Sequence, residues 1–123
     1  MSKLTDLTFA QFQMLYSTND IYLLDFFADW CGPCQMLSPE LVKLQASFPT
    51  VHFRAIDVDA EREFAANFEV RSIPAVFIVQ FTGVSFEILE EFKGNKDAFT
   101  INQIIEKALA KAKNVSQPVD TSD

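Results

Sequence analysis

The chain has 123 residues and a formal net charge of −7, and 49% of its residues are hydrophobic, including thirteen Phe. A chain of this length and apolar content is expected to fold as one domain with its own core rather than to stay disordered. The negative charge disfavours nucleic acids and anionic membranes as partners, and no apolar stretch is long enough for a bilayer span or a secretory signal.

The first part of the chain predicts an edge strand, a short helix and a buried strand. Residues 1–6 are expected to supply the edge strand. Thr8 and Gln11 have the spacing of a capping box, which indicates the start of a short amphipathic helix that ends near Asn19. The apolar run Ile21–Phe27 then predicts a strand that is buried on both faces of its sheet.

The middle of the chain predicts a longer helix, a second strand and a short helix. The longer helix is expected to begin at the two cysteines and to run to about Phe48. Pro39 lies inside it and cannot donate the helical hydrogen bond, so we expect a kink there. Val51–Val58 predicts the strand, and Ala60–Asn67 predicts the short helix.

The last part predicts a hairpin and a final helix. Ala75–Phe81 is apolar enough for a strand buried on both faces, and Ser85–Phe92 is expected to pair back with it after a turn at Gly83. Asp97 is placed as the N-cap of the final helix. That helix should bury one stripe made of Ile101, Ile104, Ile105, Ala108, Leu109 and Ala112.

The predicted elements follow one another in the order β-α-β-α-β-α-β-β-α. This order predicts an α/β fold with one central mixed sheet and helices on both faces, because parallel crossovers come first and an antiparallel hairpin comes last. We expect residues 1–113 to form the domain. Residues 114–123 are polar and lack any pattern, so we expect a disordered tail.

Residues 30–34, Trp-Cys-Gly-Pro-Cys, hold both cysteines and the only tryptophan of the chain. They follow a buried strand and open a helix, where unpaired backbone N–H groups and the helix dipole favour a thiolate over a thiol. A spacing of three residues puts both sulfurs on one helical face, close enough to form a disulfide. Pro33 suits the first helical turn, where its missing N–H has no partner to lose. The pattern indicates redox chemistry.

Each of these features could also have a purely structural or metal-binding role. The cysteine pair could be half of a zinc or iron–sulfur site, although His52 is the only histidine of the chain, or it could be a structural disulfide. Asp25 could be a hydrogen-bonded structural carboxylate, and the residues alone favour this no less than a role in proton transfer. Pro74 could follow an ordinary trans bond in a turn, and Trp30 could belong to the core.

The chain resembles the thioredoxin family over roughly residues 4–112. The segment FFADWCGPCQM at 26–36 is similar to the active-site segment of the family. Asp25 stands where the family has a buried carboxylate, and FEVRSIPA brings Pro74 to the position of the family's cis-proline. The resemblance implies the thioredoxin fold and a thiol–disulfide oxidoreductase that reduces protein disulfides.

The resemblance also implies a role for each residue of the reactive centre. Cys31, at the exposed tip of the helix, attacks a substrate disulfide, and Cys34, which is more buried, resolves the mixed disulfide. Asp25 lies beneath and takes the proton from Cys34. Gly32 and Pro33 between the cysteines set a redox potential that favours the reduction of substrates.

A flat apolar rim is expected to receive an extended substrate segment beside these sulfurs. The resemblance places Trp30, Ile73, Pro74 and Gly94 in this rim. Lys93 departs from the family, which usually has a small or apolar residue there, and we expect its ammonium to favour acidic substrate segments.

Further departures concern the surroundings of the carboxyl. Gln35 replaces a common lysine, and Ala55 takes a place where a charged residue often faces the carboxyl. Arg54 should point to the other face of the sheet by strand alternation. Since no cation faces Asp25, burial is expected to raise the pKa of its carboxyl. The hairpin after Pro74 is also about four residues longer than is usual in bacterial members of the family.

The expected partners follow from this chemistry. Thioredoxin reductase or an equivalent donor would supply electrons, disulfide-containing proteins would be the substrates, and no metal or other cofactor is expected. We expect the protein to be a monomer. We expect it in the cytoplasm, because two cysteines three residues apart do not resemble the disulfide framework of a secreted protein. The alternatives are an interaction or chaperone module that binds partners without turnover, and a disulfide oxidase or isomerase.

Overall fold

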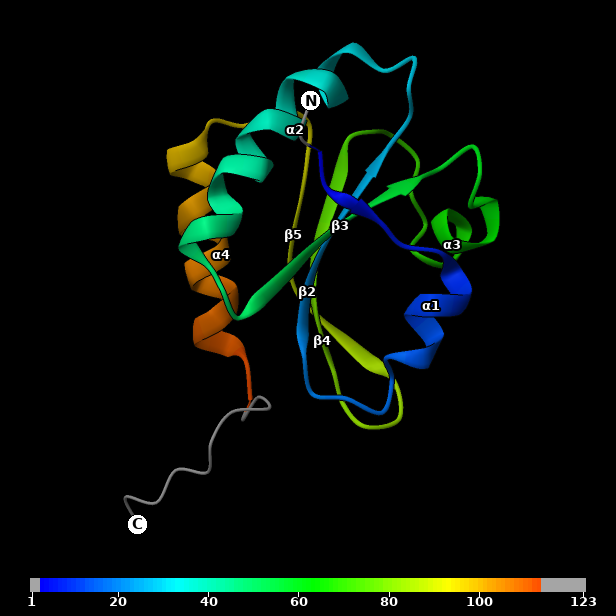
Figure 1. The fold of residues 1–123 in the computed structure, drawn as a ribbon, viewed down its shortest axis with the longest axis vertical. Coiled ribbons are helices and arrows are strands. Elements are labelled where there is room, and N and C mark those ends of the chain that lie inside the picture. The colour runs from blue at the N-terminus through cyan, green and yellow to red at the C-terminus, as the bar shows by residue number, and fades with distance from the viewer. Residues whose placement is uncertain (1–2, 114–123) are drawn as a thin grey trace.

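A computed structural model describes residues 3–113 and shows a five-stranded sheet between two layers of helices (Figure 1). The strands are β1 (Thr5–Asp6), β2 (Ile21–Phe27), β3 (Val51–Asp57), β4 (Ala75–Phe81) and β5 (Phe86–Lys93). The helices are α1 (Phe9–Met14), α2 (Gly32–Leu44), α3 (Arg62–Asn67) and α4 (Ala98–Lys111), and a 3-10 turn η1 (Gln45–Ser47) follows α2. The predicted fold class and element order are confirmed.

The strands lie in the order β1-β3-β2-β4-β5. β1, β3 and β2 run parallel, whereas β4 and β5 run antiparallel to their neighbours. β2 is central and buried on both faces, as its apolar run predicts. The carboxyl ends of β2 and β3 and the start of β4 therefore meet at one end of the sheet, and α2 begins there.

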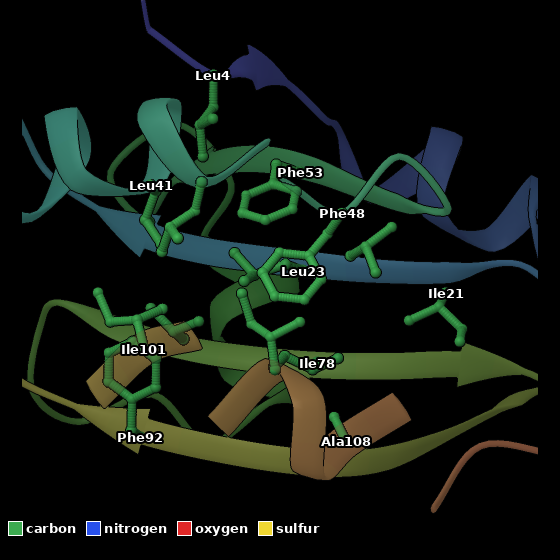
Figure 2. Close-up of a cluster of buried hydrophobic side chains, with 14 of the residues drawn as sticks. Leu4, Ile21, Leu23, Leu41, Phe48, Phe53, Ile78, Phe92, Ile101 and Ala108 are labelled. Atoms are coloured by element: carbon green, nitrogen blue, oxygen red, sulfur yellow. The ribbon is translucent and has the colours of Figure 1, made fainter. Parts of the chain in front are cut away.

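Two hydrophobic cores fill the space between the sheet and its helices. The α2/α4-side core is built around leucine and isoleucine side chains and is shown in Figure 2. The α1/α3-side core is built around phenylalanine side chains from both helices and three strands. β2 feeds both cores by alternation: Leu23 enters the first, and Leu24 and Phe26 enter the second.

Local signals fixed most helix starts as predicted. The side chain of Thr8 accepts from the backbone of Gln11, whose side chain accepts from the backbone of Thr8 in return, so the capping box is confirmed. Asp97 caps α4 by accepting from the backbone of Thr100 at 2.8 Å. Pro39 lies inside α2, and a kink there stays a prediction.

Several element ends differ from the sequence predictions. β1 covers only Thr5–Asp6, and α3 begins at Arg62 rather than at residue 60. The reason for the later start is a turn after β3, in which the carbonyl of Asp57 accepts from the backbone N–H groups of Ala60 and Glu61. The tail predicted at 114–123 lies outside the described residues.

β5 contains an irregularity that simple alternation does not predict. Ile78 pairs with Glu90 and Val79 pairs with Ile88, so Leu89 is an extra residue in β5. As a result Phe86 packs in the α1/α3-side core, whereas Phe92 packs in the α2/α4-side core. Strict alternation would have put these two rings on the same face.

A buried amide fastens the end of α4 to the sheet. Gln80 of β4 donates to the carbonyl oxygens of Asn19 and Lys113, at 3.2 and 3.1 Å, and accepts from the backbone N–H of Lys113 at 2.9 Å. Gln80 pairs with Ile21, the first residue of β2. The clamp therefore sits at the opposite end of the sheet from the start of α2.

Candidate active site

The two cysteines form a disulfide at the N-terminus of α2. Cys31 is the N-cap residue, and its sulfur accepts from the backbone N–H of Cys34 at 3.2 Å. Pro33 lies in the first turn, as predicted. An N–H group and the positive end of a 13-residue helix therefore both point at the Cys31 sulfur, which favours its thiolate form once the disulfide is reduced.

Cys31 is less exposed than the sequence suggested. Its residue is 5% exposed, against 3% for Cys34, so the predicted contrast between an open and a shielded cysteine is wrong for the disulfide form. The reason is the chain around it: the Cys31 sulfur lies 3.8 Å from the carbonyl oxygen of Ile73, and Ala28 and Val58 pack against the pair. The two sulfurs differ in what they face rather than in how open they are.

Asp25 is the buried acid of the site. It is 3% exposed, and its Oδ1 atom has no hydrogen-bond partner among the residues that the structure describes. Its neighbours in the sheet are Ala55 on β3 and Val76 on β4, and neither carries a charge. Burial disfavours the carboxylate and raises the pKa of Asp25 to about 7.

The predicted direction of Arg54 is confirmed. Its guanidinium carbon lies 5.3 Å from the centre of the Tyr22 ring, and Tyr22 belongs to the α1/α3-side core. Asp25 lies on the other face of the sheet, where its β3 neighbour Ala55 packs in the α2/α4-side core. The only arginine of β3 is thus directed away from the buried acid.

Asp25 and Cys34 line the same hollow, which has a volume of about 490 Å³. Its wall comes from three parts of the chain: α2, the ends of β2 and β3, and the N-terminal segment. These parts contribute, among others, Lys3, Leu4, Asp29, Ser38 and Ala55. The hollow gives the acid and the second cysteine a shared space in which a proton can pass between them.

The chain before β4 closes over the disulfide. The peptide bond between Ile73 and Pro74 is cis, which confirms that prediction. Gly94 has a φ of +80°, a conformation that favours glycine, and it donates from its backbone to the carbonyl of Pro74 at 2.9 Å. Lys93 is exposed and pairs with Ala75 next to this contact. Four of the predicted rim residues therefore adjoin one another: Ile73, Pro74, Lys93 and Gly94.

Trp30 is exposed rather than part of the core. Its side chain is 71% exposed, and the indole N–H donates to Oδ2 of Asp59 at 2.8 Å. Sequence reasoning missed Asp59, although a signal was present: β2 and β3 run parallel in register, with Phe27 opposite Asp57. Residues that follow these two strands must lie at the same end of the sheet, so a polar partner for Trp30 could have been sought there.

A zinc or iron–sulfur site would need further ligands close to the cysteine pair. Within residues 3–113, no group of three or more His, Cys, Asp or Glu side chains is placed to hold a metal ion. The sulfurs are instead bonded to each other above a buried acid, which is the arrangement that thiol–disulfide exchange uses. None of the helices in that same part of the chain is both long and apolar enough to cross a membrane.

The chain is similar in sequence and in structure to known proteins. The family model for thioredoxin matches residues 2–107. The thioredoxin of Chlamydia muridarum is 38% identical over 87 residues, which are 71% of this chain and 81% of that protein. Mitochondrial thioredoxin-3 of Saccharomyces cerevisiae is 43% identical over 74 residues, which are 60% of this chain and 57% of that protein.

The similarity extends to the three-dimensional structure. The crystal structure of oxidised mitochondrial thioredoxin 3 from S. cerevisiae matches with a TM-score of 0.68 and 32% identity, over 84% of this chain and 94% of that one. In sequence, the matched stretch spans less than two thirds of several curated relatives, among them the yeast protein at 57% and the thioredoxin of Mycoplasma pneumoniae at 65%. The family model nevertheless covers most of this chain, and the chain belongs to the thioredoxin family.

Proposed function

We propose that this protein is a thiol–disulfide oxidoreductase that reduces disulfides in other proteins through Cys31 and Cys34. One observation carries the proposal: a disulfide at the start of α2 shares a hollow with a buried acid that lacks a partner. A purely structural disulfide has no use for such an acid, since an unpartnered buried carboxyl only destabilises the fold.

The first step is attack by Cys31. In the reduced protein its thiolate is stabilised by the backbone N–H of Cys34 and by the dipole of α2. The thiolate attacks one sulfur of the substrate disulfide, so a bond forms from Cys31 to the substrate and the substrate S–S bond breaks. The first substrate sulfur leaves as a thiolate and takes a proton from water.

The second step is resolution by Cys34. Asp25, as a carboxylate, takes the proton of the Cys34 thiol within the shared hollow. The Cys34 thiolate then attacks the Cys31 sulfur, the mixed disulfide breaks, and the second substrate thiolate leaves. The substrate has gained two electrons and the protein has lost two, so a partner must reduce the Cys31–Cys34 disulfide before the next cycle.

Substrate binding uses the rim around the sulfurs. An extended substrate segment would lie between the exposed indole of Trp30 and the chain at Ile73 and Pro74, with Gly94 on its far side. The carbonyl of Ile73 faces the Cys31 sulfur, so backbone pairing there would bring a substrate sulfur into position. Gly32 and Pro33 between the cysteines give the pair the reducing redox potential that the family resemblance implies.

Partners and compartment are part of the proposal. Thioredoxin reductase or an equivalent donor supplies the electrons, and disulfide-containing proteins are the substrates. We place the protein in the cytoplasm, because its chemistry needs a reducing compartment. We also propose that it acts as a monomer. A yeast relative is named as mitochondrial, so the compartment needs its own test by imaging of the tagged full-length protein.

An insulin-reduction assay with a thioredoxin reductase tests the proposed function. The protein should precipitate insulin catalytically, Cys31→Ser should be inactive, and Cys34→Ser should accumulate mixed disulfides with its substrates. Met14→Ala, at an exposed position of α1 outside the active-site segment, is the control and should keep the full rate. A wild-type protein that binds insulin without reducing it would instead favour an interaction module, and a strongly oxidising potential would favour an oxidase or isomerase.

A further inference from the structure

The hollow that holds Asp25 is closed on one side by a segment remote from the cysteines in sequence. Lys3 and Leu4 line it, together with residues of α2 and the ends of β2 and β3. Leu4 is 3% exposed and belongs to the α2/α4-side core. Figure 2 shows its side chain pointing from the N-terminal segment into that core, beside α2.

A short strand joins this segment to the sheet. β1 has two residues, and its pairing with β3 consists of Thr5 opposite Arg54 and Asp6 opposite Ala55, continued by a backbone hydrogen bond from Leu7 to Ala55. Ala55 is also the direct neighbour of Asp25 on β3. Ala55, Leu4 and Asp25 line the same hollow, so the N-terminal segment forms part of the wall beside this small side chain.

We propose that Leu4 is a positioning residue for the proton transfer: as the apolar wall of the hollow it keeps water from the carboxyl of Asp25. This inference rests on the proposed function, because it concerns how Asp25 takes the proton of Cys34. Burial is the cause of the high pKa of this carboxyl, and Leu4 contributes to that burial from outside α2 and the neighbouring strands.

The charged groups around the hollow leave this role to an apolar side chain. Lys3 from the N-terminal segment, Asp29 from the loop after β2 and Cys34 from α2 are the titratable groups that share the hollow with Asp25. β3 and β4 contribute only Ala55 and Val76 beside the acid. No ion pair with Asp25 is found among the described residues. The access of water is therefore the main factor that sets the pKa of its carboxyl.

Truncation of Leu4 should therefore hydrate the carboxylate and make Asp25 a weaker base. In Leu4→Ala the titration midpoint of Asp25 should fall by about one pH unit. Resolution of a preformed mixed disulfide should begin to speed up at lower pH, because the carboxylate appears earlier. It should also level off at a rate on the order of threefold lower, because a weaker base takes the proton less readily. A merely loosened fold would not produce this pair of changes.

The first measurement is a ¹³C-carboxyl NMR titration of the oxidised full-length protein, in which Asp25→Asn identifies the resonance. Leu44→Ala is the matched control: it loses the same atoms from the same core, at a position that does not line the hollow. Its midpoint should equal that of the wild type. Leu4→Val removes less volume and serves if Leu4→Ala fails to fold.

The second measurement places the effect on Asp25. In an Asp25→Asn background, Leu4→Ala should leave the pH profile of resolution unchanged, since the base through which it acts is gone. An unshifted midpoint in both Leu4 variants, or an equal shift in Leu44→Ala, would overturn the inference. The NMR midpoint does not depend on turnover, so failure of the inference differs from failure to reduce insulin, which would overturn the proposed function alone.

Discussion

The two faces of the central sheet are packed for different purposes. The α1/α3 face is filled by rings: Phe12 alone lies within 4.9 to 5.7 Å, centroid to centroid, of five other aromatic side chains. The α2/α4 face is apolar as well, but at its active-site end it leaves a hollow and a carboxyl without a partner among the described residues. One face supplies stability, and the other gives up some stability for chemistry.

The largest expected effect comes from a substitution in the α1/α3-side core. Phe12→Ala removes a fully buried ring and should lower the free energy of unfolding by about 3–5 kcal/mol. Met14→Ala, on the same helix but exposed, should stay within about 0.5 kcal/mol of the wild type. Urea denaturation at neutral pH measures both. A small loss for Phe12→Ala would mean that the aromatic core relaxes around the gap.

The next effect tests what the chemical face gives up. The pKa of Asp25 is about 7 in the folded protein, against an ordinary value of 3.8, so folding binds a proton between these pH values and stability falls as pH rises through this window. Asp25→Asn removes the buried charge. Because the buried charge is gone, the variant should be more stable than the wild type at pH 8. Its amide is also unpartnered, which limits this gain to about 2 kcal/mol, and near pH 4 the variant should be no more stable than the wild type.

Chemical denaturation at several pH values checks this, alongside the decay of a preformed mixed disulfide, which the variant should resolve more slowly. The first attack by Cys31 should change less. An Asp25→Asn protein that is less stable at pH 8 and resolves at the wild-type rate would make Asp25 a structural carboxylate.

A smaller effect concerns the indole beside the disulfide. Asp59→Ala removes the acceptor of the Trp30 N–H, and since both groups are exposed the free energy of unfolding should change by less than about 1 kcal/mol. The KM for insulin should rise, because the indole is no longer held beside the sulfurs. Asp29→Ala, another exposed acid near the site, provides the comparison. Equal KM changes in the two variants would point to net charge rather than to the orientation of Trp30.

The smallest effect is one of charge at the rim. Lys93→Glu should raise the KM for acidic peptide disulfides a few-fold more than for basic ones, and added salt should narrow the difference. Lys107→Glu, on α4, carries the same change of net charge and is the control. Steady-state kinetics with two peptides of opposite charge measure it. Without any charge dependence, Lys93 takes no part in substrate choice.

The strands and the reactive pair could be predicted from the sequence because their signals are local. The apolar runs indicated β2 and β4 with their observed bounds, and the capping pattern indicated the start of α1. The cis bond before Pro74 came from family resemblance rather than from local physics.

What sequence reasoning missed depends on packing between distant segments. The extra residue Leu89 reverses which side chains of β5 point to each face of the sheet, and nothing in the local sequence pattern indicates it. The burial of Cys31 depends on Ile73, 42 residues away, and the wall of the hollow depends on Leu4. A spacing can place two sulfurs on one helix, but it does not say what covers them.

The Gln80 clamp has a practical consequence for how the molecule can be attached to other objects. It fixes Lys113 beside the first residues of β2, whereas the disulfide lies beyond the last residue of that strand (Figure 1). A dye, bead or fusion partner joined after Lys113 therefore leaves the fold at the end remote from the sulfurs. Immobilisation through that side orients the reactive end towards solution, which suits capture of substrates on a surface.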